Sequence, residues 1–424
     1  MSKLFVAICF CFALFSVVSS ENFPGCSGEV NNNPTLYPEP KLVASTAHGK
    51  KYIIGEGSYA LNLGVFNGTP REVGYAYGKL FKEEIKSTFD LMLDYVALQV
   101  REEIKKLPWY LHWLKYLPVK SVFKFALETE YIATFFFVPR RWEEELNGVA
   151  HGAGISPSFV KNMNLFPELI RAACSIVGTW GPATENQGLL QLRALDWDAD
   201  APMSKNPMIS IYHFNQPGSQ PFANFGWAGL IGSLAGFSDK VGIAEKVWLP
   251  FQKNITSEFG KPWMYVLRDV LQFATDLDSG IQILKESHRT WQIFVGLGSR
   301  EDNQLRGIEY SAKVLNVYDD KNYTTPYPNA HPQMDGVVFF DKHVQPSNDP
   351  CLGSILKAGY GHITPDYLFR TGAGLHKTGD TLLAIYDFAN QGVYIAYSEY
   401  GTGNPAYNRS MTYLDMTALF NIQV

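Results

Sequence analysis

A change in the spacing of apolar residues near position 174 constrains the fold more than any other feature of the sequence. Before this point apolar residues recur every three or four positions, which predicts amphipathic helices. One helix should begin after Thr69, because Thr69, Pro70 and Glu72 form a capping box with a proline in the first turn, and it should continue to about residue 106. Further helices are expected at 141–153 and 157–171.

After position 174 the pattern changes to short apolar runs separated by turn residues, which predict strands. These runs lie at 189–192, 208–214, 241–248, 293–297, 307–317, 337–341, 382–387 and 393–398. Two helices are expected between them, at 263–274 and 281–286. The chain should therefore be mostly helical before residue 174 and α+β after it.

The first twenty residues have the pattern of a secretory signal peptide. Lys3 precedes an apolar stretch, Leu4–Val18, and small residues end at Ser20. We therefore expect a secreted or lysosomal protein. Export also makes four N-x-S/T sequons candidate glycosylation sites on the surface, at Asn67, Asn254, Asn322 and Asn408.

The composition limits the classes of function. Apolar residues make up 46% of the 424-residue chain, which is enough for a large core. Lys and Arg number 36 against 41 Asp and Glu, so no basic excess supports nucleic-acid binding. The segment 107–142 is rich in aromatic residues with interleaved Lys and Arg. It favours either core helices or a surface that docks on lipid.

Three cysteines remain after loss of the signal peptide. Cys26 and Cys351 lie in loop-like stretches that suit a disulfide, and Cys174 lies between apolar segments, where it is either an inert buried thiol or a nucleophile. Neither H-E-x-x-H nor C-x-x-C occurs, so we expect no metal site and no cofactor. The G-x-S-x-G motif of serine esterases is also absent.

The residues around Cys174 resemble a known family. The stretch Asn164–Val177 is similar to the cleavage-site region of acid ceramidases and N-acylethanolamine-hydrolysing acid amidases. The run R-A-L-D-W-D at 193–198 resembles their G-R-N-x-D-[FY] segment. Glu145–Ser156 is similar to a helix that this family shares with isopenicillin N acyltransferase-like proteins.

The resemblance implies an α+β fold, the αββα sandwich of antiparallel sheets found in N-terminal-nucleophile hydrolases, preceded by a mostly helical α-subunit. The precursor would cut itself before Cys174, giving an α chain of 21–173 and a β chain of 174–424 that stay associated. The Cys174 sulfur would then be the nucleophile. Its freed α-amine, with an ordinary pKa near about 8, would be the base.

The same resemblance assigns further roles. Arg193 would stabilise the thiolate, and Asp196 would hold the α-amine and Arg193 in place. Asn329 would donate to the oxyanion, and Glu245 would be an additional catalytic carboxylate. Cys26 and Cys351 would form the disulfide between the two chains.

The family resemblance makes a lipid amide of the ceramide or N-acylethanolamine type the expected substrate, met at a membrane surface. A lipid-transfer activator protein is a candidate partner, and nucleic acid is not expected. Two alternatives stay open. One is an acyltransferase or hydrolase of small non-lipid N-acyl amides, and the other is a non-enzymatic family member that never cleaves.

Overall fold

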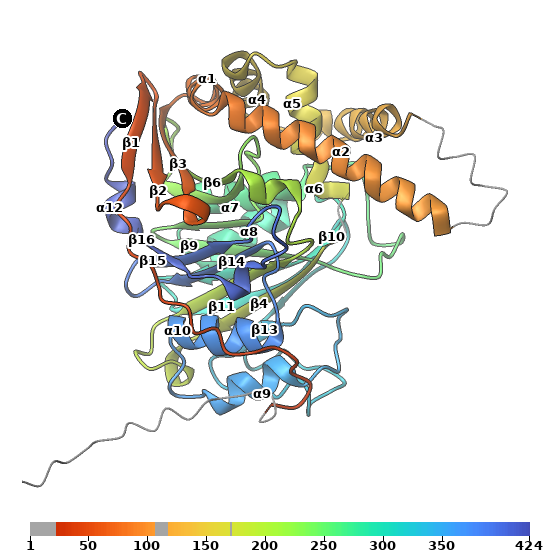
Figure 1. Cartoon of the computed structure of the whole chain (residues 1–424). Coiled ribbons are helices and arrows are strands. Elements are labelled where there is room, and N and C mark those ends of the chain that lie inside the picture. Colours follow the sequence, from red (N-terminus) through yellow and green to blue (C-terminus); the bar gives the residue numbers. More distant parts are fainter. Residues whose placement is uncertain (1–22, 107–117, 170–171) are drawn as a thin grey trace, which may run out of the picture.

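Two stacked β-sheets form the centre of the molecule in this computed structural model, which describes residues 23–106, 118–169 and 172–424 (Figure 1). The larger sheet has ten strands in the order β1-β2-β3-β6-β7-β8-β9-β10-β11-β12, and only its β3–β6 pair is parallel. Its strands are β1 Lys41–Thr46, β2 Gly49–Ile54, β3 Leu61–Gly68, β6 Pro207–Phe214, β7 Phe222–Trp227, β8 Ala235–Ser238, β9 Val241–Val247, β10 Gln292–Ser299, β11 Gln304–Ser311 and β12 Leu315–Tyr318.

The smaller sheet has six antiparallel strands in the order β13-β4-β5-β14-β15-β16. They are β13 Val337–Phe340, β4 Ala173–Thr179, β5 Leu190–Asp196, β14 Leu382–Asp387, β15 Gly392–Tyr397 and β16 Thr412–Asp415. Cys174 therefore lies at the start of β4, which pairs with β13 on one side and β5 on the other.

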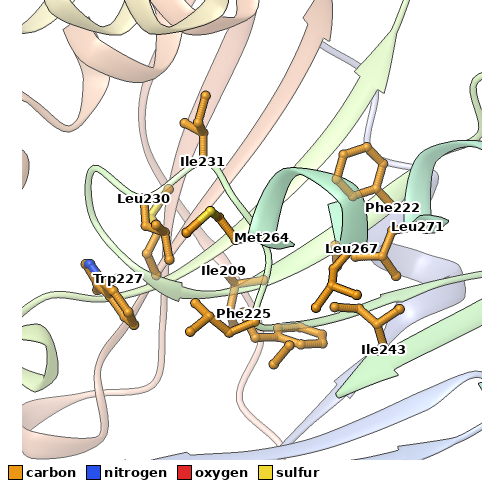
Figure 2. Close-up of a cluster of buried hydrophobic side chains, with 14 of the residues drawn as sticks. Ile209, Phe222, Phe225, Trp227, Leu230, Ile231, Ile243, Met264, Leu267 and Leu271 are labelled. Carbon is orange, nitrogen blue, oxygen red and sulfur yellow. The ribbon is translucent and has the colours of Figure 1, made fainter. Parts of the chain in front are cut away.

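Helices cover the outer face of the larger sheet (Figure 1). Figure 2 shows Met264, Leu267 and Leu271 of α7 directed at the strand residues Ile209 and Ile243. The helices on this side and at its end are α1 Pro70–Leu80, α2 Lys82–Lys106, α3 Val119–Thr134, η4 Phe135–Phe137, α4 Arg140–Ala153, α5 Pro157–Asn164, α6 Phe166–Leu169, α7 Trp263–Phe273 and α8 Leu277–Glu286.

A second helical layer covers the smaller sheet. Leu352, Leu356 and Phe369 pack there against Val177 and Leu192. The elements of this layer are α9 Cys351–Ala358, α10 Pro365–Tyr367, η7 Leu368–Ala373 and α11 Gly374–His376, and the chain ends near α12 Met416–Phe420. Short 3-10 turns lie at η2 Gly57–Tyr59, η5 Gly181–Ala183, η6 Pro202–Lys205 and η8 Ala406–Asn408. The four layers confirm the expected αββα sandwich.

The two sheets approach closely at the level of β4 because glycines face the smaller sheet. A side chain at Gly296 would come within 2.6 Å of Ile176 Cγ2, and one at Gly242 would come within 2.9 Å of Gln191 Oε1. Ile176 packs there against Ala244 and other apolar side chains. This contact fixes the position of β9 along β4. It therefore determines which side chains of β9 lie near the start of β4.

The helix expected from Thr69 to residue 106 begins as predicted, since Thr69 and Glu72 form the capping box. It is interrupted at Phe81 and continues as α2. Six strands were missed, of which β7, β8 and β16 lie beyond position 174 and β1, β2 and β3 lie before it. β1, β2 and β3 come from residues 41–68 and extend the larger sheet, because β3 pairs with β6 from beyond position 174. The run 307–317 also forms two strands rather than one, β11 and β12.

Cys26 and Cys351 form a disulfide, as the family resemblance implied, with their Cα atoms 4.8 Å apart. The expected signal peptide lies outside the described residues. Among the sequon asparagines, the side chains of Asn254, Asn322 and Asn408 are exposed and that of Asn67 is half-buried, so their glycosylation remains a prediction.

The aromatic segment keeps an exposed face. Phe136 is 87% exposed, Phe125 71% and Ile132 64%, all on α3 or η4. Trp109 and Trp113 of the same expected surface lie outside the described residues. Within the described residues, no helix combines the length and the apolar character that crossing a bilayer requires.

Candidate active site

Cys174 is fully buried, and its side chain lies on the face of β4 that meets the larger sheet. Strand alternation puts it on the same face as Ile176, which packs against Ala244 of β9. Burial raises the pKa of the Cys174 thiol to about 12 in this intact chain. The positive charges of Arg193 and Lys246 lower that pKa, whereas Glu245 and Asp196 raise it. Four charged side chains therefore act on one sulfur.

Arg193 and Glu245 form a buried ion pair beside the cysteine. Arg193 lies opposite Ile176 in the β4–β5 ladder, and its Nη2 is 3.4 Å from Glu245 Oε2. Burial raises the pKa of Glu245 to about 7, although Arg193 opposes the shift. Among the described residues, Arg193 Nε and Nη1 and Glu245 Oε1 are buried without hydrogen-bond partners. Two guanidinium donors are thus free to bind a further oxygen.

Asp196 lies opposite Ala173 in the same ladder, beside the peptide that joins Ala173 to Cys174. Its carboxylate accepts hydrogen bonds from Thr378 Oγ1 at 2.7 Å and from the Gly379 backbone N–H at 2.6 Å. The Thr378 hydroxyl is also 2.7 Å from Ser175 Oγ. These contacts fix the orientation of the Asp196 carboxylate at the end of β5.

Lys246 is a member of the site that sequence reasoning missed. Gly242, Ala244 and Lys246 alternate along one face of β9, where Gly242 meets Gln191 and Ala244 meets Ile176. The next position on this face is level with Cys174. Lys246 is 3% exposed, and its Nζ donates to the Lys342 carbonyl at 3.4 Å. Among the described residues, no carboxylate lies within salt-bridge distance of it.

A buried ammonium without a carboxylate partner is costly, and such groups often serve a function. Burial lowers the pKa of Lys246, while the negative charges of Cys174, Asp341, Asp196 and Glu245 raise it. The only sequence signal was a lysine inside an otherwise apolar strand-like run, 241–248. Its importance depends on the register between the sheets.

Asn329 does not join this group. It lies in the long loop between β12 and β13, its side chain is exposed, and within the described part of the chain it makes no hydrogen bond. The oxyanion role assigned to it by resemblance therefore stays a prediction. Cys174, Arg193, Asp196 and Glu245 are brought together, from two neighbouring strands of one sheet and a facing strand of the other.

A small cavity of about 20 Å³ lies beside Glu245. Glu245 lines it together with apolar side chains, and Pro167 and Ala172 from the segment before Cys174 form part of its wall. The lining comprises Pro167, Ala172, Leu195, Trp197, Met203, Trp227, Leu234, Glu245, Val247 and Trp263. Three of these residues are tryptophans, so the space beside Glu245 suits an apolar group.

The two facing sheets between helical layers form an αββα sandwich, with Cys174 buried at the start of β4. No family model matches the sequence. The chain is 35% identical to protein dcd1A of Dictyostelium discoideum, with 99% of each chain covered. It is 34% identical to protein dcd1B of the same organism, covering 92% of this chain and 81% of that one. The chain belongs to the dcd1 protein family.

Two solved structures are also similar to the chain at low identity. One is a Caenorhabditis elegans N-acylethanolamine-hydrolyzing acid amidase ortholog, with a TM-score of 0.38 and 11% identity, over 57% of this chain and 100% of that chain. The other is a penicillin V acylase from Agrobacterium tumefaciens, with a TM-score of 0.37 and 9% identity, over 57% of this chain and 86% of that chain.

Proposed function

We propose that the protein is an N-acyl amide hydrolase that activates itself by cleavage before Cys174. This proposal rests on the arrangement of Arg193, Asp196 and Glu245 around the Cys174 sulfur. An inert buried cysteine does not require cationic side chains beside it. Here the Arg193 guanidinium keeps donors without hydrogen-bond partners among the described residues, and Lys246 has no carboxylate partner among them. Such charges suit a sulfur that becomes a thiolate.

In the first step the Cys174 sulfur attacks the Ala173 carbonyl carbon. The peptide C–N bond breaks, the nitrogen takes up the thiol proton and becomes the α-amine, and Ala173 is held as a thioester. Water then hydrolyses the thioester, releasing the Ala173 carboxylate and restoring the thiol. Arg193 has two free donors for the developing oxyanion.

In each later turnover the α-amine accepts the thiol proton, and the sulfur attacks the substrate carbonyl. The amine product leaves with that proton, and water hydrolyses the acyl thioester. Asp196 orients the α-amine through its position opposite Ala173, where Thr378 and Gly379 hold it. A neutral α-amine is required, and the cation of Lys246 favours it by disfavouring a second positive charge nearby.

Two features favour a lipid amide as substrate. Pro167 and Ala172 form part of the wall of the cavity beside Glu245, so a movement of the cleaved end would enlarge this cavity. Exposed Phe125, Ile132 and Phe136 offer an apolar face for contact with a membrane. The proposal also includes a secreted or lysosomal location and a lipid-transfer protein as partner. A small polar amide remains the second candidate, because 20 Å³ by itself holds no acyl chain.

The test is intact mass and N-terminal sequencing of the purified protein after incubation at pH 4.5 and pH 7. We expect a chain that starts at Cys174 and stays linked to its partner until the Cys26–Cys351 disulfide is reduced. Cys174→Ala should remain a single chain of unchanged mass. Two-chain processing in that variant would refute the nucleophile, and an uncut wild type would favour the non-enzymatic alternative.

A further inference from the structure

Two glutamates outside the proposed active site are buried near each other. Glu130 lies on α3 and is 6% exposed, and Glu168 lies on α6 and is 3% exposed. The negative charge of Glu130 raises the pKa of Glu168, so the two carboxyl groups lie within electrostatic reach of each other. A third carboxylate, the exposed Glu258 in the loop before α7, acts on Glu130 in the same direction.

The hydrogen bonds of this pair leave one oxygen of each carboxyl group without a partner. Glu168 Oε1 accepts from the Trp263 backbone N–H at 2.8 Å and from Thr290 Oγ1 at 3.1 Å. Within the described residues, Glu168 Oε2 and Glu130 Oε1 are buried and make no hydrogen bond. Two neighbouring buried carboxylates cannot both ionise cheaply, so protonation favours this packing.

Cations in the adjoining elements are engaged by other groups. Each of these side chains has its own partners: Lys261 pairs with Asp269, Lys161 pairs with Glu143, and Arg289 donates to the carbonyls of Leu284, Lys285 and Ser311. Two further titratable groups face Glu168, the phenols of Tyr265 on α7 and Tyr310 on β11, and burial keeps both protonated. No described cation therefore lies within salt-bridge distance of either glutamate.

The pair joins helices of the segment before Cys174 to loops of the segment after it. Glu168 binds the first residue of α7 and the residue Thr290 just before β10, and Trp291 faces Glu130. Helix α3 and the adjoining η4 also carry the exposed apolar side chains of Phe125, Ile132 and Phe136. The packing of Glu130 therefore helps to fix the position of this apolar face.

Ionisation of the pair would weaken this packing. Burial raises the pKa of Glu130 to about 7, Glu258 adds to the shift, and Trp291 opposes it. Burial also raises the pKa of Glu168 well above its ordinary value. With α3 released into water, each carboxyl would titrate near about 4.3. The packed state binds more protons between these values, so acid favours it and rising pH favours release.

We propose that Glu130 and Glu168 form a proton-dependent latch, which holds α3 and η4 against the loops before α7 and β10 in acid and releases them as the pH rises through neutrality. The released helix would no longer present Phe125, Ile132 and Phe136 in one fixed position. Both glutamates lie outside the Cys174 site, so the latch does not depend on the proposed hydrolase activity.

The test is hydrogen exchange followed by mass spectrometry on the full chain carrying Cys174→Ala, so that self-cleavage cannot contribute. We expect the amides of α3 and η4 to exchange at least about tenfold faster at pH 7.5 than at pH 5.0, after correction for intrinsic rates. Glu130 alone, with a pKa of about 7, shifts the equilibrium about 60-fold between these pH values. Adding Glu130→Gln and Glu168→Gln together should abolish the difference.

Matched variants identify the group that titrates. Glu128→Gln changes an exposed carboxylate two positions from Glu130 on the same helix, and it should keep the full dependence on pH. His288→Gln, which removes an exposed imidazole packed against Phe137, should keep it as well. Glu130→Gln alone leaves the hydrogen bonds of Glu168 in place and should reduce the difference at least about fivefold, which provides a test if the double variant does not fold.

Three results would overturn the proposal. One is equal corrected exchange of α3 at the two pH values, and another is an undiminished difference in Glu130→Gln. The third is loss of the difference in His288→Gln, which would assign the dependence on pH to that histidine.

Discussion

Glu245 should make the stability of the protein fall as the pH rises toward neutrality. Its carboxyl is 2% exposed, and burial raises its pKa to about 7 despite the Arg193 guanidinium 3.4 Å away. In the unfolded chain the same carboxyl titrates near about 4.3. Between these two values the folded protein keeps a proton that the unfolded chain has lost. The free energy of unfolding therefore decreases as pH rises through this window.

The size of the effect follows from the two pKa values. The difference of about 2.7 units corresponds to about 3.7 kcal/mol, which is present below pH 4 and lost by about pH 8. Glu245→Gln keeps the shape of the neutral carboxyl and cannot ionise. Between pH 4.5 and pH 8, the free energy of unfolding of wild type should therefore fall by about 3 kcal/mol more than that of the variant. This comparison does not depend on the stability of the variant at either pH.

The measurement is urea unfolding at several pH values, followed by tryptophan fluorescence, for wild type and Glu245→Gln. Glu309→Gln is a suitable control, because that carboxylate is only partly buried and lies on β11, which β10 separates from β9. Parallel pH curves for wild type and Glu245→Gln would refute the reasoning, since they would mean that Arg193 fully compensates the buried charge. In that event Glu245 would be ionised throughout the physiological range.

Three further predictions concern the proposed chemistry. Lys246→Met should slow self-cleavage by about 10–100-fold, because a nearby cation favours the thiolate. Lys246→Arg should restore part of the rate, and Lys240→Met at the surface should have no effect. An unchanged rate in Lys246→Met would show that Lys246 does not act on Cys174. Changing Phe125 and Phe136 to Ser should reduce hydrolysis of a lipid amide in vesicles at least fivefold more than hydrolysis of a soluble short-chain amide, and equal losses on both would argue against membrane docking. Asn329→Ala should lower turnover by about 10²–10³-fold if the loop brings this side chain to the oxyanion after cleavage; an unchanged rate would assign the oxyanion to the free donors of Arg193.

Local sequence signals predicted the parts of the fold that depend on a few neighbouring residues. The capping box at Thr69 marked the first residue of α1, because its hydrogen bonds join residues three apart. Alternating and continuous apolar runs located most strands beyond position 174, since strand period is also a local property. The loop-like surroundings of Cys26 and Cys351 suited a disulfide, although the pairing itself came from the family resemblance.

The family resemblance reached further into the site, but incompletely. It chose Arg193, Asp196 and Glu245 by motif, and the structure brings all three to Cys174. It could not find Lys246, because the meeting of β4 with β9 depends on glycine contacts between two sheets. It also missed β1–β3, whose place in the larger sheet depends on pairing with a strand more than 140 residues away, as Asn62 and Met208 illustrate.

The sequence by itself therefore determined the order and type of most elements, the candidate nucleophile and the two disulfide cysteines, because each rests on local pattern or motif. The tertiary structure decided which side chains surround the sulfur, and it left Asn329 on an exposed loop. It also brought Glu130 of α3 to Glu168 of α6, although helices α4 and α5 lie between them in the chain. Sheet register and layer packing set these meetings, and neither is encoded in any short stretch of residues.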